Sequence, residues 1–218
     1  MMTEKTPTAM TIDGWPFKLR LPQIDTPRDR LLLLLHGHLG NENVMWILTK
    51  SIPQSYTLLA PRAPIELGPG QYSWHTIQPQ WPTLRGAYQD LASDLLERVD
   101  SWTKENAPEI ERYDVMGFSQ GAVMAYALSF LHPLKINKVA AIAGFVPQTW
   151  KNDLADIDLR DRRYFIAHGK QDEIIPIKKA RQAEGLLKEK GAEVQFCSAD
   201  TGHKLGANCF NGLGEFFS

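Results

Sequence analysis

The chain has 218 residues, of which 43% are hydrophobic and 22% charged, with a formal net charge of −1. These are ordinary values for a globular protein, and the length favours one domain, residues 1–218. The balanced charge offers no basic surface for nucleic acid or an anionic membrane. The longest leucine run, Leu31 to Leu35, is too short to span a bilayer, so no stable membrane insertion is expected.

The chain contains two cysteines, Cys197 and Cys209. The first eleven residues are polar and lack the apolar stretch of a signal peptide. We therefore expect a cytoplasmic protein in which both cysteines are reduced thiols.

Hydrophobic patterns predict strands that alternate with helices along the chain. In chain order we expect a strand at 12–21, a strand at 30–35, a helix at 43–51, a strand at 56–60, a helix at 83–104, a strand at 113–116, a helix at 122–131, strands at 138–143 and 163–167, a helix at 176–190, a strand at 193–197 and a helix at 205–217. The leucine run is expected as a strand despite the helix preference of leucine, because it is short and ends in His36-Gly37. The alternation predicts an α/β fold with a mainly parallel central sheet flanked by helices.

Residues 62–82 form a long segment rich in Pro, Gly and Trp without periodicity. Loops of this length inside a compact domain are usually functional or disordered, and the aromatic content argues against disorder. We expect this loop to lie on the substrate side of the fold.

The pentapeptide Gly117-Phe118-Ser119-Gln120-Gly121 lies between a predicted strand and a predicted helix. A G-x-S-x-G turn in that context exposes the serine hydroxyl above a helix N-terminus, and the glycines permit the tight turn. The motif predicts that Ser119 is a nucleophile.

A serine hydroxyl needs a base, usually a histidine that a carboxylate orients, in the chain order Ser, Asp or Glu, His. His203 follows the last predicted strand and comes after every candidate acid, so it is the expected base. His168 precedes the candidate acid, and we expect it to hold a loop through backbone hydrogen bonds.

The expected acid is Asp172, in the loop between the strand at 163–167 and the helix at 176–190. Its neighbour Glu173 is the main alternative, and Asp200, three residues before the histidine, is another. Asp200 fits a turn better, because its spacing from the histidine is short.

Acyl transfer also needs two donors for the developing oxyanion. The Gln120 N–H, at the start of a helix, is one candidate. The loop His36-Gly37-His38-Leu39-Gly40 follows the leucine strand and would supply the other, with the Leu39 N–H as first candidate and that of His38 as second.

The assembled motifs resemble those of the phospholipase/carboxylesterase family of small α/β-hydrolases. The shared pieces are Leu35-His36-Gly37, Gly40-Asn41-Glu42, Pro61-Arg62-Ala63-Pro64, Ser73-Trp74, Gly117 to Gly121, His168-Gly169 with Asp172 and Pro176, and Gly202-His203. The resemblance implies Ser119, Asp172 and His203 as catalytic residues, with oxyanion donors at Leu39 and Gln120. The sequence departs from the family pattern at three positions. The family often has an aspartate in the region of Asn41, an aromatic residue and an aspartate after the loop tryptophan, where His75 stands here, and a second glycine at the position of Ala122.

The expected activity is hydrolysis of a small-molecule or acylated ester or thioester with an apolar acyl group, without metal or organic cofactor. Trp74, on the aromatic loop, is the first candidate for substrate contact, together with His38 and Phe118; Trp46 and Trp81 are further candidates for an apolar wall.

Other functions compete with this one. His36-x-His38 at a strand end is typical of a metal pair, which would make the protein a metal-dependent hydrolase, although no further spaced cluster of ligands supports it. A hydrolase-fold ligand receptor with slow turnover would carry the same motifs. A nucleotide-binding fold is weaker, because Gly117 to Gly121 lacks the required glycine spacing.

Overall fold

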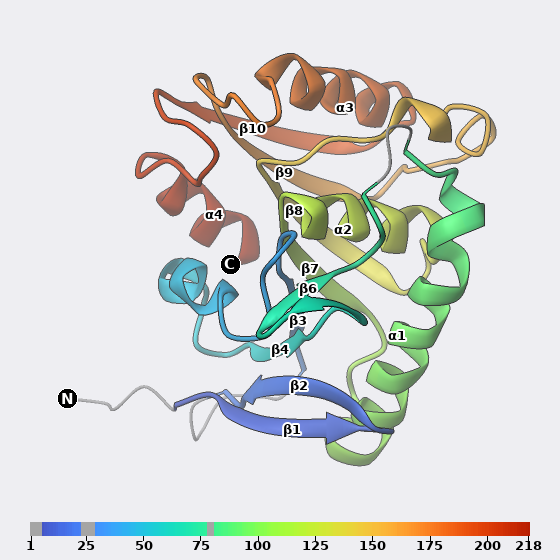
Figure 1. The fold of residues 1–218 in the computed structure, drawn as a ribbon, viewed down its shortest axis with the longest axis vertical. Coiled ribbons are helices and arrows are strands. Elements are labelled where there is room, and N and C mark those ends of the chain that lie inside the picture. Colours follow the sequence, from blue (N-terminus) through green and yellow to red (C-terminus); the bar gives the residue numbers. More distant parts are fainter. Residues whose placement is uncertain (1–5, 23–28, 78–80) are drawn as a thin grey trace.

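The computed structural model describes residues 6–22, 29–77 and 81–218. Eight strands form one sheet in the order β1-β2-β4-β3-β7-β8-β9-β10 (Figure 1). They are β1 (Thr8–Ile12), β2 (Trp15–Arg20), β3 (Leu31–Leu35), β4 (Thr57–Pro61), β7 (Tyr113–Phe118), β8 (Ile136–Ile142), β9 (Arg163–Gly169) and β10 (Glu193–Ala199). Within this sheet, β4, β3, β7, β8, β9 and β10 are parallel to one another. β2 pairs antiparallel with β4, and β1 pairs antiparallel with β2. The fold class therefore agrees with the prediction.

Helices cover both faces of the sheet (Figure 1). α1 (Leu84–Asn106), α2 (Gln120–Leu131) and α3 (Ile177–Glu189) contribute to the larger apolar core on one face. The 3-10 helix η1 (Met45–Ser51) and α4 (Cys209–Phe217) pack in the smaller core on the other face. None of the helices in these described ranges is long and apolar enough to cross a membrane.

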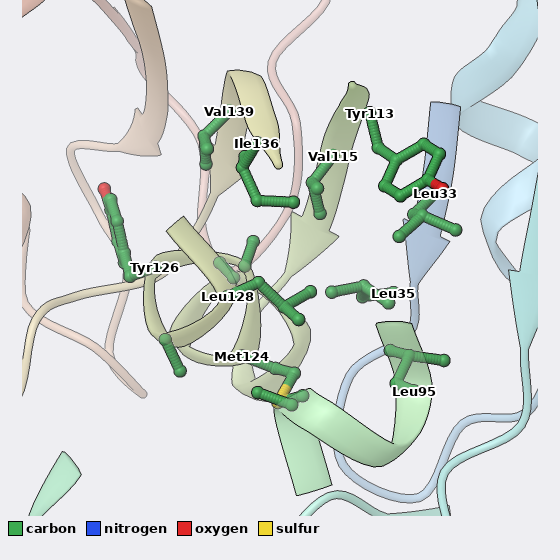
Figure 2. Close-up of a cluster of buried hydrophobic side chains, with 14 of the residues drawn as sticks. Leu33, Leu35, Leu95, Tyr113, Val115, Met124, Tyr126, Leu128, Ile136 and Val139 are labelled. Carbon is green, nitrogen blue, oxygen red and sulfur yellow. The ribbon is translucent and has the colours of Figure 1, made fainter. Parts of the chain in front are cut away.

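The leucine run forms the centre of the sheet because successive side chains of a strand point to opposite faces. Leu31, Leu33 and Leu35 pack toward α1 and α2, and Leu32 and Leu34 pack toward η1 and α4. Figure 2 shows the first of these cores, in which Leu33 and Leu35 lie beside side chains of β7, α1 and α2. A strand buried on both faces requires an unbroken apolar run, and this outweighs the helix preference of leucine.

Two expected elements differ in detail. The strand expected at 12–21 is the hairpin β1–β2, because Asp13 and Gly14 adopt φ values of 47° and 77° and reverse the chain between the two strands. The loop at 62–82 contains a second hairpin, β5 (Ile65–Gly68) and β6 (Gln71–Ser73), and its residues 78–80 lie outside the described ranges.

The expectation of two reduced thiols is wrong in this structure. Cys197 on β10 and Cys209 at the start of α4 form a disulfide, with Cα atoms 5.8 Å apart and a sequence separation of 12. The segment between them folds back, so the end of β10 and the start of α4 become neighbours. That closed segment contains His203, and sequence spacing alone gives no sign of the pairing.

Candidate active site

The predicted chemistry-bearing residues gather at the carboxyl ends of the parallel strands, where ligands bind in open α/β sheets. Ser119 follows β7, Asp172 follows β9, and His203 follows β10. The loop that begins at His36 follows β3, the neighbour of β7.

Ser119 stands on a strained turn between β7 and α2. Its backbone has φ 53° and ψ −116°, values that non-glycine residues rarely adopt and that are typical of a nucleophile elbow. Side chains at Gly117 and Gly121 are impossible without rearrangement, because a Cβ at Gly117 would lie 2.1 Å from the Gly121 oxygen and one at Gly121 would lie 2.1 Å from the Leu35 oxygen. The two glycines thus allow the backbone on either side of Ser119 to approach closely and allow Gly121 to pack against the end of β3.

A continuous hydrogen-bonded chain joins Ser119, His203 and Asp172. His203 Nε2 lies 2.9 Å from Ser119 Oγ, and His203 Nδ1 lies 2.7 Å from Asp172 Oδ2. The carboxylate can only accept, so the Nδ1 atom carries a hydrogen and Nε2 is left to accept the serine proton. This is the geometry that a serine nucleophile requires.

Asp172 is fully enclosed and accepts three hydrogen bonds, one of them from His203. Its Oδ1 accepts hydrogen bonds from the Ile174 N–H at 2.9 Å and the Ile175 N–H at 2.8 Å. Burial raises the pKa of the Asp172 carboxyl, but the bonds from Ile175, His203 and Ile174 outweigh it, so the pKa lies below its usual value. The carboxylate is therefore ionised when it faces the imidazole.

His168, the one histidine of β9, lies beside this carboxylate. Its Nε2–H donates to the Ile175 oxygen at 2.7 Å and lies 3.3 Å from Asp172 Oδ2. The expected role of His168 in holding a loop through the backbone agrees with this bond. Its contact with Asp172 was not predicted, although the spacing of four residues was visible in the sequence.

The two competing acids lie elsewhere. Glu173 is exposed to solvent. Asp200 is also exposed and pairs with Lys170, whose Nζ lies 3.1 Å from Asp200 Oδ1. Of the three candidates, Asp172 is the one that His203 contacts.

His36 anchors the loop that follows β3. Its Nε2 accepts a hydrogen bond from the Ala63 N–H at 2.9 Å, so its Nδ1 carries the hydrogen that is donated to the Gly37 oxygen at 2.7 Å. Burial lowers the pKa of His36 to about 4, which keeps the ring neutral at pH 7. A metal pair with His38 would need one of these two nitrogens, and both are engaged. Within the described ranges, no group of three or more His, Cys, Asp or Glu side chains is arranged to hold a metal.

The same loop carries both candidates for the second oxyanion donor. The Leu39 N–H donates to the Tyr72 oxygen at 3.0 Å, which pairs the loop with the edge of β6. The first candidate is therefore engaged in this structure, and the expectation for Leu39 is corrected. The His38 N–H makes no backbone hydrogen bond with another described residue. The adjoining Gly37 lies against Ser119, since a Cβ there would be 3.3 Å from Ser119 Cβ.

The side chain of Gln120 joins the loop at 62–82 to the turn that carries Ser119. Its Oε1 accepts hydrogen bonds from the Trp74 N–H at 2.9 Å and from Ser73 Oγ at 3.1 Å, and its Nε2 donates to the His75 oxygen at 3.1 Å. The Gln120 N–H is free of backbone hydrogen bonds to the described residues, which leaves it available at the N-terminus of α2. Sequence reasoning predicted a role for this N–H and missed the role of the side chain.

Two pockets share His38 in their lining, and one of them contains Ser119. The serine-side pocket, of about 650 Å³, is lined by Ser119 and Gln120 with an apolar wall that includes Ile77, Trp81, Phe145, Ile174 and Ile175. The oxyanion-loop pocket, of about 500 Å³, is lined by residues 37–40, by Val44, Met45, Ile47 and Leu48 of the η1 region, and by Phe118, Lys204, Leu205 and Phe210. His38 lines both pockets.

The predicted substrate contacts divide between these pockets and the core. His38 and Phe118 line pockets, as does Trp81. Trp74 is only 1% exposed, and its Nε1 donates to the His36 oxygen at 2.8 Å. The expectation that Trp74 contacts substrate is wrong, because tertiary packing places it behind the oxyanion loop as a support. Trp46 packs against the smaller core.

Comparisons with known proteins agree with this architecture. The solved carboxylesterase from Mesorhizobium loti superposes with a TM-score of 0.80 over 97% of this chain and 98% of the other, at 21% identity. The chain therefore has an α/β-hydrolase fold.

Sequence comparison defines the class more narrowly. Residues 21–218 match the model of the phospholipase/carboxylesterase family, and the chain belongs to that family. It is 25% identical over 194 residues to the Escherichia coli protein named esterase YpfH, which covers 83% of this chain and 78% of the relative. It is 29% identical over 182 residues to acyl-protein thioesterase 1 of Kluyveromyces lactis, which covers 75% of this chain and 78% of the relative.

Proposed function

We propose that the protein is a serine hydrolase that cleaves carboxylic esters or thioesters of apolar acyl groups through an acyl-enzyme intermediate. The observation that carries the proposal is the unbroken chain of hydrogen bonds from Ser119 Oγ through the His203 ring to Asp172. Family membership supports the general activity, since one relative is named an esterase and another an acyl-protein thioesterase.

The reaction proceeds in two steps. His203 Nε2 takes the Ser119 proton as the hydroxyl oxygen attacks the carbonyl carbon, and Asp172 stabilises the imidazolium that forms. The imidazolium then donates this proton to the leaving alcohol or thiol, whose bond to the acyl carbon breaks. Water attacks the acyl-serine by the same route, giving the carboxylic acid and restoring the Ser119 hydroxyl.

The backbone N–H groups of His38 and Gln120 are the proposed oxyanion donors. Support comes from the engagement of the Leu39 N–H with Tyr72 and from the contact distance between Gly37 and Ser119. Removing one donor from such a pair typically costs about 3 kcal/mol in the transition state.

The apolar acyl preference rests on the serine-side pocket. One wall is hydrophobic and includes Trp81, Phe145 and Ile174, while Gln148, Thr149 and Lys179 also line the pocket. A pocket of this volume and composition fits a hydrocarbon chain better than a charged group.

Hydrolysis of p-nitrophenyl esters of graded chain length, by the wild type and by Ser119→Ala, tests the mechanism. We expect the substitution to abolish measurable turnover and to abolish labelling by a fluorophosphonate. Ser93→Ala is a matched control, because Ser93 Oγ also lies near a histidine, 3.4 Å from His132 Nε2, at a place remote from the pockets. Undiminished activity of Ser119→Ala, or labelling that persists in it, would refute the proposal.

A further inference from the structure

Ser119 lines the serine-side pocket, and the oxyanion-loop pocket shares His38 with it and contains Phe118, which precedes the serine. We propose, resting on the function proposed above, that the oxyanion-loop pocket receives the leaving group, and that the natural substrate is a small ester or thioester whose alcohol or thiol part is itself apolar. The serine-side pocket then receives the acyl chain.

The assignment follows from where the proton must go. In the tetrahedral intermediate the oxyanion faces the N–H donors, and the leaving oxygen or sulfur must face His203 to receive its proton. The remaining substituent, the carbon chain of the acyl group, must therefore extend away from His203.

Only one of the two pockets is built from residues that flank His203. Lys204 and Leu205 follow it directly in the chain and line the oxyanion-loop pocket. Phe118, in the same wall, packs its ring against the His203 ring with centroids 5.1 Å apart. The serine-side pocket takes its walls instead from Trp81, Phe145 and the segment after Asp172.

The lining of the oxyanion-loop pocket indicates the chemistry of the leaving group. Apart from Lys204 and His38, its side chains are hydrophobic, and Val44 and Ile47 remain 45% and 67% exposed at its edge. A ligand that covers large exposed hydrophobic side chains at the edge of a pocket gains free energy of binding. A volume of about 500 Å³ suits a small organic group, and ligand pockets commonly fall in the range of about 300–1,000 Å³.

Two series of esters separate the two pockets. In the first series the acyl group is always acetyl and the alcohol grows from methyl to hexyl; in the second the alcohol is always methyl and the acid grows from acetic to heptanoic. Acid release is followed by titration, so that no chromogenic leaving group occupies either pocket. For the wild type we expect kcat/KM in the alcohol series to rise by about three- to fourfold per methylene until the pocket is filled.

Three tryptophan substitutions at exposed positions make the test specific. Val44→Trp fills the oxyanion-loop pocket, Ile77→Trp fills the serine-side pocket, and Leu67→Trp adds the same side chain outside both. Each variant is compared with its own rate on methyl acetate. We expect Val44→Trp to remove the gain along the alcohol series, Ile77→Trp to remove the gain along the acid series, and Leu67→Trp to change neither.

The results of the two ester series separate a failure of the pocket assignment from a failure of the proposed hydrolase function. A wild type whose rate is indifferent to alcohol length, or a Val44→Trp variant that loses the acid series instead, overturns the assignment. An absence of Ser119-dependent hydrolysis in both series would instead refute the proposed function itself.

Discussion

His168 Nε2 lies 3.3 Å from Asp172 Oδ2 while it donates a hydrogen bond to the Ile175 oxygen at 2.7 Å. Both side chains are completely enclosed, and His203 contacts the same Oδ2 atom at 2.7 Å. The bond from His168 to the Ile175 oxygen holds the turn whose N–H groups bind the Asp172 carboxylate. We regard His168 as a positioning residue for the proposed reaction.

Replacement of His168 tests this role. His168→Leu removes the donor to the Ile175 oxygen, and we expect kcat to fall by about three- to tenfold with little change in KM, because a neutral hydrogen bond contributes about 0.5–1.5 kcal/mol. His168→Gln keeps an N–H donor in a similar place and should recover most of the loss. The measurement is steady-state ester hydrolysis, with thermal unfolding of each variant as control. A stable His168→Leu variant with wild-type kcat would exclude a positioning role.

The ion pair between Glu42 and Arg62 predicts a pH-dependent stability. Arg62 Nε and Nη2 each donate to Glu42 at 2.7 Å, and these bonds hold the pKa of the Glu42 carboxyl below its usual value. A lowered folded-state pKa stabilises the fold above the unfolded-state pKa of about 4.3, and this stabilisation is lost as the pH falls through the folded-state value.

Glu42→Gln should therefore lower the free energy of unfolding by about 1 kcal/mol at pH 7. The difference from the wild type should shrink as the pH falls below about 4.3 and the wild-type carboxyl becomes protonated. Urea denaturation between pH 7 and pH 3 measures the free energy of unfolding of the wild type and of Glu42→Gln. A difference that stays constant over this range would contradict the assignment of the stabilisation to the ionised carboxylate.

The lack of a side chain at Gly144 leaves room for the methyl group of Ala122, at a position where the family often has glycine. A Cβ at Gly144 would lie 2.4 Å from the Ala122 Cβ, and the φ of Gly144 lies outside the left-handed region. The absence of a side chain at Gly144 is thus a matter of space rather than of backbone conformation.

A double-mutant cycle tests this compensation. We expect Gly144→Ala to destabilise the fold by about 1–3 kcal/mol through overpacking. Ala122→Gly alone should cost about 1 kcal/mol, as glycine does in a helix. The double variant should be more stable than Gly144→Ala, because the clashing methyl group is gone. Strictly additive losses, measured by urea unfolding, would show that the two positions do not interact.

The Cys197–Cys209 disulfide closes the segment that carries His203. Loss of a cross-link over a loop of this length costs about 3 kcal/mol in the chain-entropy description. We expect the double variant Cys197→Ala/Cys209→Ala to be destabilised by about this amount, and reductant to bring the wild type close to it. Thiol titration of unreduced, unfolded protein provides the check: two free thiols would contradict the disulfide.

The local sequence predicts those site residues whose position depends on one neighbouring strand or helix. Ser119 could be placed on its turn because an apolar strand and a helix flank it within a few residues. Asp172 and His203 could be placed after strands for the same reason, and parallel strands bring such positions to one edge of a sheet.

The tertiary structure decided the features that depend on contacts between distant segments. The Leu39 N–H donates to the oxygen of Tyr72, 33 positions later in the chain. The Trp74 side chain is buried and donates to the His36 oxygen. Neither bond leaves a trace in local hydrophobic periodicity. The order of Ser119, Asp172 and His203 after their strands is therefore readable from the sequence, because strands are local and their ends converge at one edge of the sheet. Long-range packing alone decides which N–H of the loop after β3 is unengaged and which side chains line the two pockets.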